Sequence, residues 1–498
     1  MLIVPGRPGS RALLWWLYSP DGARINVNRL RLILGGPNSS GSNEIQCRKV
    51  LHGLGRDGDD PIAKNIFVVA TSDLEPDTEY TLTLTDEADS ASARTLPVAG
   101  DLKPLSIAVG SCYGRSRGKE IDAWLQLKDS FNEPNDPLRF RILCGDQIYL
   151  DLDPDDDGTI KIFTPPVWKR YLEQWLDQPF RDFLTASPNI MMADDHEFWN
   201  NYPVRNRGWN FWGDRELGGE TGQRFDRAFS LFQAALNLDA GRLVDDSSEA
   251  NRAAVDRQLR DSVRTFEMDF GFMKLLILDV RTRRTSSTFN GGNGRLAAPR
   301  FDGLPNVRWL EDTIRSLKAL TVPAVLVLSQ PLVEEPGASA PWEENLPEYP
   351  DDYALLWDAV FAAQSNILVV SGDIHWTRLY CVTNSSQPDE EVYEFIASPL
   401  SRIRSFAGTA DPTLPDRSQG SVKWEGREGR GLAQWKRWPP GYVRDDENVY
   451  ATLTFTPEGS SAGVMIHVDA WLWPLERPSL KPVRHKRFLL KGRQQRGN

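Results

Sequence analysis

The sequence is poor in cysteine and in histidine: its 498 residues include four cysteines and five histidines. Four cysteines are too few for a disulfide scaffold. They are also widely scattered along the chain, at Cys47, Cys112, Cys144 and Cys381. Although one bridge remains possible, we expect free thiols, or a thiolate that binds a metal ion.

Long apolar runs are lacking as well. No stretch reaches the roughly 18 consecutive apolar residues that a transmembrane helix needs, so no membrane span is expected. The apolar run 13–17 follows Pro5 and is followed by the turn residues 19–22, which is unlike a secretory leader and predicts a strand. We expect a cytoplasmic protein, or a secreted or periplasmic one if a leader has been removed.

The chain has no excess of positive charge. Lysine and arginine number 58 against 69 aspartates and glutamates, which gives a net charge of −11. A nucleic-acid-binding surface is therefore not expected, since such proteins carry a basic face. A local basic pocket for an anionic small molecule remains compatible with this balance.

The first 100 residues show strand patterns and almost no helix patterns. Alternating residues predict a half-buried strand over Ile25–Ile33, with a bulge where the alternation changes phase at Arg29. Further strands are predicted over 65–70 and, after a turn at Pro76, from Tyr80 onward. The Leu-x-Pro-x-Thr-x-Tyr pattern ending at Tyr80 resembles the tyrosine corner of fibronectin III-like sandwiches. We expect an all-β sandwich domain over residues 1–100 and a linker at 100–104.

Strands alternate with helices after the linker, which predicts an α/β domain over residues 105–498. Strands are predicted over 106–109, 138–144, 189–193, 272–278, 324–328 and 366–370, and helices over 119–130, 166–178, 180–186 and 222–236. Further strands over 449–455, 464–471 and 488–490 are expected to close this domain with a second sheet. Two polar loops are expected, over 283–305 and 401–446.

Polar side chains follow six of these strands. The strand 189–193 runs directly into Asp194, Asp195, His196 and Glu197, and four ionisable groups in a row are costly to bury without compensation. The other five strands end in Gly-Ser-Cys at 110–112, Gly-Asp-Gln at 145–147, Asp-Val-Arg at 279–281, Ser-Gln at 329–330 and Gly-Asp-Ile-His at 372–375. Because ligands of α/β sheets bind at the carboxyl ends of strands, we expect one site there.

The residue types at these strand ends favour metal ions. Asp146 and Asp373 each follow a glycine, which lets the backbone turn tightly beside an ion. Cys112 can supply a thiolate and Tyr149 a phenolate, an anionic and partly soft set that suits ferric iron. The carboxylate oxygens of Asp195 and the amide oxygen of Asn200 suit a hard ion such as Ca²⁺.

Taken in order, these motifs resemble the alkaline phosphatase D-type (PhoD-like) branch of the calcineurin-like metallophosphatases. The resemblance is carried by Gly-Ser-Cys, Gly-Asp-Gln-Ile-Tyr, Asp-Asp-His-Glu with Asn-Asn behind it, Leu-Asp-Val-Arg, Ser-Gly-Asp-Ile-His and Ala-Ser-Pro-Leu-Ser, over about residues 105–401. Ser111-Cys112 stands where most metallophosphatases have Asp-x-His, which favours this branch. The resemblance implies two sheets packed face to face and flanked by helices.

The resemblance also implies a function: hydrolysis of phosphate monoesters or diesters, by a metal-bound hydroxide at a binuclear site of Fe³⁺ and Ca²⁺, with Zn²⁺ or Mn²⁺ as other options. The implied catalytic residues are His196, as general acid, and Asp195. The implied metal ligands are Cys112, Asp146, Tyr149, Asp195, Asn200, Asp373 and His375, with Asp146 bridging. Arg281 and Arg115 are the candidates for substrate binding, and Asp194 for orienting His196.

Two other interpretations remain open at this point. The chain could be a non-catalytic ligand-binding protein on a metallophosphatase scaffold, but every strand-end position of the expected ligand set is filled. A metallo-hydrolase of amides or lactones would need more histidine ligands than His196 and His375 at the strand ends. The expected partner is a small-molecule phosphate ester, while its identity and the oligomeric state stay open.

Overall fold

A computed structural model describes most of the chain. The described residues are 1–20, 25, 27–35, 44–56, 59–85, 89–114, 138–150, 167–199, 202–203, 220–243, 253, 255–259, 263–284, 308–333, 345–375, 377–385, 387–400, 419–425, 430–437, 448–460, 463–474 and 484–492. The predicted helix over 119–130 and most of the predicted loop over 283–305 lie outside these ranges.

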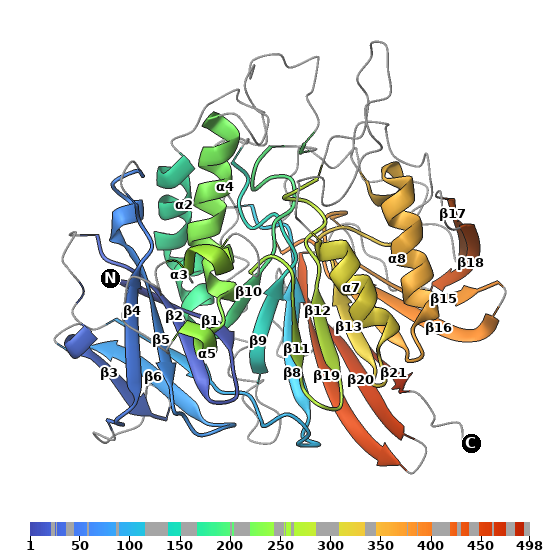
Figure 1. Cartoon of the computed structure of the whole chain (residues 1–498), viewed down its shortest axis with the longest axis horizontal. Coiled ribbons are helices and arrows are strands. Elements are labelled where there is room, and N and C mark those ends of the chain that lie inside the picture. The colour runs from blue at the N-terminus through green and yellow to red at the C-terminus, as the bar shows by residue number, and fades with distance from the viewer. Residues whose placement is uncertain are drawn as a thin grey trace.

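The described residues form a mixed α/β fold with four sheets and few helices (Figure 1). The four-stranded sheet contains, in spatial order, β1 (Leu2–Pro8), β2 (Ala12–Tyr18), β5 (Ile66–Ser72) and β4 (Arg48–Gly53), and the three-stranded sheet contains β3 (Leu30–Leu34), β6 (Glu79–Leu84) and β7 (Ser90–Arg94). The six-stranded sheet contains β10 (Asn189–Met191), β9 (Leu138–Leu143), β8 (Leu105–Gly110), β19 (Val449–Ser460), β20 (Gly463–Pro474) and β21 (Arg484–Lys491). The eight-stranded sheet contains β11 (Phe266–Asp269), β12 (Lys274–Ile277), β13 (Ala324–Val327), β14 (Ile367–Ser371), β16 (Gln387–Ile396), β15 (Arg378–Asn384), β18 (Arg430–Arg437) and β17 (Gln419–Glu425).

The helices cover the outer faces of the two large sheets. They are α2 (Val167–Leu176), α3 (Gln178–Thr185), α4 (Glu220–Phe232), α5 (Ala240–Leu243), α7 (Trp309–Lys318) and α8 (Pro350–Ala362), with 3-10 turns η1 (Val27–Arg29), η2 (Ala63–Asn65), η5 (Ala234–Asn237) and η6 (Leu346–Glu348). One buried apolar cluster joins the six-stranded and eight-stranded sheets. A second joins α7 and α8 to the eight-stranded sheet, and a third joins α2, α3 and α4 to both the six-stranded and the four-stranded sheet.

The predicted strand over 13–17 is confirmed, and its lack of alternation has a structural reason. β2 lies in the four-stranded sheet with both faces covered, so all seven of its residues are buried. Trp15 faces the three-stranded sheet, whereas Trp16 faces the helices. The indole Nε1 of Trp16 donates to Leu231 O on α4 at 2.7 Å.

The predicted strand over Ile25–Ile33 is wrong in its first half. Residues Val27–Arg29 form the 3-10 turn η1, and β3 begins only at Leu30. The change of phase at Arg29 marks the end of this turn and not a bulge inside a strand. The strands expected over 65–70 and from Tyr80 onward are confirmed as β5 and β6.

The apolar strands that precede the polar motifs are confirmed. β8 pairs with β9 in parallel, and β9 with β10; β12, β13, β14 and β16 form a second parallel series. The helices expected over 166–178, 180–186 and 222–236 are found as α2, α3 and α4, with η5 completing the last. Parallel pairing places the carboxyl ends of each series at one edge of its sheet.

Two expectations about the second half of the chain are wrong. The C-terminal strands do not form a separate second sheet, because β19 pairs antiparallel with β8 and thereby extends the sheet of β8. Residues 401–446 are not wholly irregular either, since they contain β17 and β18. The strands β11, β15 and β16 were not predicted. Many of their residues are polar, so their sequences lack the continuous apolar run of a strand buried on both faces.

Two expectations from composition can be compared with the described residues. All four cysteines are free. No helix in the described part of the chain is both long enough and apolar enough to cross a membrane.

The edge strand β10 is completed by a side chain in place of a further strand. Asn237 Oδ1 accepts from Met191 N at 3.0 Å, while Asn237 Nδ2 donates to Met191 O at 2.7 Å and to Val263 O at 2.8 Å. The side chain of Asn237 is buried, so water does not replace these bonds. The amide thus fixes the strand that leads into Asp194.

Replacing Asn237 with alanine should lower the free energy of unfolding by about 3 kcal/mol, because it leaves the backbone groups of Met191 buried without partners. Denaturant unfolding measures this change. The matched control is Asn366→Ala, whose amide also bonds the backbone in both directions but is only half-buried. The control should lose no more than about 1 kcal/mol; equal losses for the two variants would contradict the role given to Asn237.

Candidate metal centre

Backbone hydrogen bonds hold the strand ends together. Cys112 N donates to Gly145 O at 3.1 Å, and Tyr113 N donates to Asp146 O at 2.8 Å, so the segments after β8 and β9 are joined. Gly372 N donates to Ser329 O at 3.0 Å, which joins the segments after β13 and β14. The predicted convergence of polar strand ends is therefore confirmed, but it spans two sheets instead of one.

The backbone at this convergence has an unusual conformation. Cys112, Asp146, Asp373 and His375 all have positive φ, between 54° and 74°, although none is glycine. Such residues cost of order 1–3 kcal/mol each and gather at functional sites. Gly145 also has a positive φ of 103°, and a Cβ there would lie 2.5 Å from Asp194 Cβ. These turns aim several side chains at one small volume.

Three groups of side chains in this volume could each hold a metal ion, since their ligand atoms lie within 4.8 Å of one another. The groups are Cys112 with Asp146 and His375; Asp146 with Asp195 and His196; and Asp146 with Asp194, Asp195 and Asp373. Asp146 belongs to all three. Of the seven residues in these groups, sequence reasoning named five as candidate ligands, His196 as a general acid and Asp194 as the group that orients His196. The five candidate ligands are Cys112, Asp146, Asp195, Asp373 and His375.

The first group mixes three donor types. Cys112 Sγ lies 3.6 Å from Asp146 Oδ2, and Tyr149 Oη lies 3.1 Å from His375 Nε2. Ser398 Oγ donates to Cys112 Sγ at 3.3 Å. A thiolate, a carboxylate, an imidazole and a neighbouring phenol form a set with softer donors, of the kind that transition metals bind.

The carboxylates of these groups are buried close together, where several negative charges repel one another and lack the stabilisation that water provides. Asp146, Asp194 and Asp195 are each less than 5% exposed. Burial, followed by the charges of Asp195 and Cys112, raises the pKa of Asp146 well above its usual value. Burial raises the pKa of Cys112 to about 12. A bound cation reverses both effects, since it stabilises the deprotonated ligands.

Asp194 offers a direct test of whether a cation fits. Its Oδ1 accepts from Arg281 Nε at 2.6 Å and from Ser329 Oγ at 3.1 Å. Its Oδ2 is buried and has no hydrogen-bond partner among the described residues. An unpaired buried carboxylate oxygen is costly, and a metal ion among Asp146, Asp195 and Asp373 would satisfy it. The residues present therefore fit a metal ion.

Asp194 was expected to orient His196, and the structure gives it a different position. Its carboxylate contacts Arg281 and Ser329 and belongs to the group of four carboxylates. His196 is held otherwise: its backbone N–H donates to Asp146 Oδ1 at 3.2 Å, and the centre of its ring lies 4.3 Å from the centre of the Tyr149 ring. The place of Asp194 at the end of the apolar run 189–193 was the signal available in the sequence.

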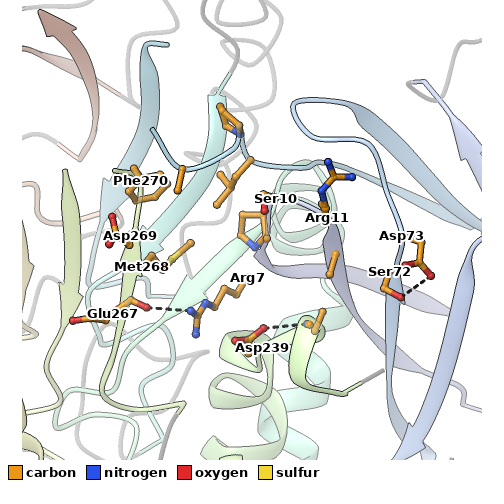
Figure 2. Close-up of a pocket in the computed structure, with 18 of the residues that line it drawn as sticks. Arg7, Ser10, Arg11, Ser72, Asp73, Asp239, Glu267, Met268, Asp269 and Phe270 are labelled. Atoms are coloured by element: carbon orange, nitrogen blue, oxygen red, sulfur yellow. Dashed lines mark hydrogen bonds between the residues drawn. The ribbon is translucent and has the colours of Figure 1, made fainter. Parts of the chain in front are cut away.

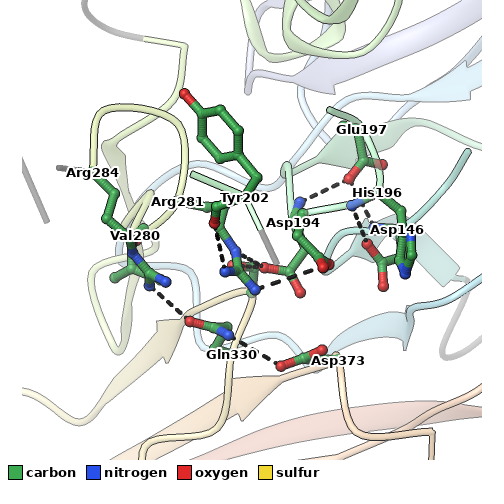
Figure 3. Close-up of polar contacts among 12 residues, drawn as sticks. Asp146, Asp194, His196, Glu197, Tyr202, Val280, Arg281, Arg284, Gln330 and Asp373 are labelled. Atoms are coloured by element: carbon green, nitrogen blue, oxygen red, sulfur yellow. Dashed lines mark hydrogen bonds and ion pairs between the residues drawn. The ribbon is translucent and has the colours of Figure 1, made fainter. Parts of the chain in front are cut away.

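Arg281 is buried beside the carboxylates (Figure 3). Besides Asp194, it contacts Tyr202 O through Nη1 at 2.9 Å, and its Nη2 lies 3.9 Å from Asp195 Oδ1. Burial alone would lower the pKa of Arg281, but the charges of Asp194 and Asp195 raise it above its usual value. Arg281 thus supplies a fixed positive charge to this cluster. The other predicted residues, Arg115 and Asn200, lie outside the described residues.

Glu197 was not predicted as a site residue, yet it positions the backbone of the site. Its Oε2 accepts from Asp194 N at 2.7 Å and Asp146 N at 3.0 Å, while its Oε1 accepts from Gln147 N at 2.7 Å and Gln233 Nε2 at 3.2 Å. Burial raises the pKa of Glu197 to about 7, although these donors oppose the shift. One carboxylate therefore joins the segments after β9 and β10.

Gln330 was recognised only as a polar strand end, and it links two neighbouring groups. Its Oε1 accepts from Arg284 Nη2 at 2.7 Å, and its Nε2 donates to Asp373 Oδ2 at 3.2 Å (Figure 3). The amide thereby fixes one oxygen of the Asp373 carboxylate, while Arg284 fixes the amide in turn.

This fold and this site define a class: a mixed α/β protein with a candidate metal centre at the carboxyl ends of its strands. The family model of the PhoD-like phosphatases matches residues 111–436, which is more than half of the chain. The protein therefore belongs to the PhoD-like phosphatase family. The matched span contains every residue of the three groups described above.

Solved structures agree with this membership at the level of the fold. The structure of PhoD superposes with a TM-score of 0.62 at 15% sequence identity, covering 99% of this chain and 90% of that chain. A structure of GAP50, described as the anchor in the inner membrane complex of Plasmodium, gives a TM-score of 0.36 at 11% identity, covering 78% of this chain and 90% of that one. A score that low does not show a shared fold. No curated protein matches the chain.

Replacing Glu197 with glutamine should lower turnover of a phosphate ester by about 10-fold to 100-fold, as for other groups that hold metal ligands in place. The free energy of unfolding should fall by about 3 kcal/mol, because one carboxylate oxygen becomes an amide donor that faces backbone N–H groups. Steady-state kinetics and denaturant unfolding measure the two changes.

The control for this variant is Glu311→Gln on α7, where the side chain is 52% exposed. It should stay within about 0.5 kcal/mol of the parent protein and retain its turnover. If Glu197→Gln behaved like this control, Glu197 would not be the residue that fixes the segments after β9 and β10.

Proposed function

We propose that this protein hydrolyses phosphate esters with the help of two metal ions, ferric iron and calcium. The observation that carries the proposal is the buried cluster of Asp146, Asp194, Asp195 and Asp373 next to Cys112, in which one carboxylate oxygen has no partner among the described residues. Family membership supports the reaction class. A small-molecule phosphate monoester or diester is the proposed substrate.

Residues would divide between the two ions by donor type. Cys112, Tyr149, Asp373 and His375 would hold the iron, and Asp195 with Asn200 the calcium. Asp146 would hold both, which agrees with its presence in all three groups. Bound there, the ions supply positive charge that stabilises a phosphoryl group and acidifies a water molecule. Zinc or manganese are the other options for the same ligands.

The protein's own residues then have defined tasks. The imidazole of His196 would donate a proton to the leaving oxygen, and the bond from the backbone N–H of His196 to Asp146 Oδ1 fixes the main chain at this residue. Arg281 would add a fixed positive charge near the phosphoryl oxygens, with Arg115 as the second candidate. Gln330 keeps Asp373 in position through its hydrogen bond to Asp373 Oδ2, and Arg284 in turn holds Gln330.

The proposal extends to the fold. We infer that residues 1–100 form a fibronectin III-like sandwich and residues 105–498 the catalytic domain, in which two sheets pack face to face. Tyr80 supports the first part, since its Oη accepts a hydrogen bond from Glu75 N at 2.8 Å across the Pro76 turn. The apolar cluster shared by the six-stranded and eight-stranded sheets supports the second.

Purified protein should contain iron and calcium in near-stoichiometric amounts, and it should hydrolyse p-nitrophenyl phosphate or bis-p-nitrophenyl phosphate until EDTA is added. A ferric ion held by Cys112 should also absorb visible light. Elemental analysis, turnover and absorption on one sample test this, and the ratio of the two rates separates monoesterase from diesterase activity. A protein that contains no metal and shows no turnover would overturn the proposal in favour of a ligand-binding protein.

Cysteine variants provide the control for the iron assignment. Cys112→Ser should remove the thiolate part of the visible absorption and leave a band from the Tyr149 phenolate, whereas Cys381→Ser, the same change in a half-buried thiol of β15, should leave the spectrum unchanged. Turnover with zinc or manganese and no band would retain the reaction class and refute the assignment of Cys112 to iron.

His196→Asn should separate substrates by their leaving group. Turnover of an alkyl phosphate, whose alkoxide must be protonated, should fall by about 100-fold or more, because general acids contribute on that scale. Turnover of a p-nitrophenyl ester, whose leaving group needs no proton, should fall much less. His467→Asn, in a side chain that is 37% exposed, is the control. If His196→Asn lost equal turnover on both substrates and also bound less metal, His196 would be a metal ligand and not the general acid.

A further inference from the structure

A cavity of about 520 Å³ lies at the other end of the eight-stranded sheet from the metal groups. One border of the cavity is the turn between β11 and β12, at the amino end of β12. Asp279 and Arg281 lie beyond the carboxyl end of the same strand. The turn between β1 and β2, the segment 96–99 and the start of α5 form further walls, and Arg48 of β4 with Ser72 and Asp73 at the end of β5 complete the lining (Figure 2). The cavity is therefore distinct from the candidate metal centre.

Arg7 is one of three arginines that line this cavity, together with Arg11 and Arg48. Its Nη2 donates to Glu267 O at 3.2 Å, and its guanidinium lies 4.3 Å from the centre of the Phe266 ring. No described carboxylate pairs with it. Burial lowers the pKa of Arg7, an effect that an anion beside the guanidinium would reverse. Arg7 thus has donor capacity that the described residues leave unused.

Arg11, from the same β1–β2 turn, also lines the cavity (Figure 2). It makes no ion pair with any described residue. Four carboxylates also line the cavity, and each accepts a hydrogen bond from a described group. Asp73 Oδ2 accepts from Ser72 Oγ at 3.4 Å. Asp239 accepts from Gly241 N at 3.0 Å, Glu267 from Lys274 Nζ at 3.3 Å and Asp269 from Gly271 N at 2.7 Å. Asp239 and Glu267 are also ion-paired, with Arg242 and Lys274. The wall therefore carries charges of both signs, and Arg7 and Arg11 contribute guanidinium groups that form no ion pair with a described carboxylate.

The wall also has an apolar part, which includes Leu96, Pro97, Met268 and Phe270. A volume of about 520 Å³ is within the range of small-molecule sites, and such sites combine an apolar lining with a few polar groups. Because carboxylates also border the cavity, a ligand with several negative charges would be repelled. One anionic group joined to an apolar body suits both parts of the wall.

We propose that this cavity is a second small-molecule site, which takes an organic oxyanion with one anionic head group, a phosphate ester or a carboxylate, and an apolar body. Arg7 and Arg11 would bind the head group, since guanidinium groups pair with such oxyanions through two parallel hydrogen bonds. Met268 and Phe270 would contact the apolar body. The site does not depend on the proposed hydrolysis of phosphate esters.

Isothermal titration of the full chain with phenylphosphonate, which phosphatases do not hydrolyse, and with benzoate tests this proposal. The metal centre is removed from the measurement by Asp146→Asn, or by Asp373→Asn if the first variant fails to fold. In that background at least one of the two compounds should bind, and the tighter one identifies the preferred head group. Absence of binding by both would overturn the proposal.

Arginine variants locate the bound compound. Arg11→Gln, and separately Arg7→Gln, should weaken binding by about tenfold or more, the equivalent of about 1.4 kcal/mol. Arg31→Gln on β3, whose side chain is 52% exposed, should not change it. Binding that survives both cavity variants unchanged would place the compound elsewhere and refute the site.

Discussion

The main constraint on this structure is the repulsion among four carboxylates at the strand ends, which the rest of the fold must offset. Ligand oxygens of Asp146, Asp194, Asp195 and Asp373 lie within 4.8 Å of one another, and the ion pairs of Arg281 reach two of the four residues. One guanidinium cannot neutralise four carboxylates in a buried volume. A folded state that holds them together must lower their combined charge. Protonation is one way, since burial raises the pKa of Asp146 and Asp194, and a bound cation is the other, which links metal binding to the stability of this region.

Such a cluster must also be held in place by parts of the chain that do not bind the ions. Three other buried carboxylates do this by accepting backbone N–H groups. Glu197 holds the segments after β9 and β10, Asp279 accepts from Arg281 N and Thr282 N at 2.8 Å each, and Glu394 accepts from Leu332 N and Val333 N at 2.7 and 2.8 Å. Each of these strand-end turns is thus fixed by an acceptor, which is how irregular backbone can remain buried.

Sequence reasoning identified the candidate ligands because their signal is local. An apolar run that ends in Gly-Asp or Asp-Asp-His-Glu places charge where burial is costly unless an ion compensates it. Asp146, Asp373 and Cys112 were identified in this way, and the structure brings them together. Glu197 was not, because its function depends on which backbone groups come near it, and that is set by the pairing of β9 with β10. Pairing between distant strands, such as β19 with β8, was missed for the same reason.

The N-terminal sheet is connected to the metal centre through packing as well as through sequence. One apolar cluster runs from β2 across α2 and α4 to β9 and β10, so the region 1–100 shares a core with the residues that follow it. Trp16 bonds Leu231 O, and two residues later Gln233 bonds both Tyr171 and Glu197. Because Glu197 in turn holds the backbone of Asp146, the N-terminal sheet supports the position of a ligand that belongs to all three groups. A chain lacking that sheet would keep every ligand but would expose the helix face that fixes them.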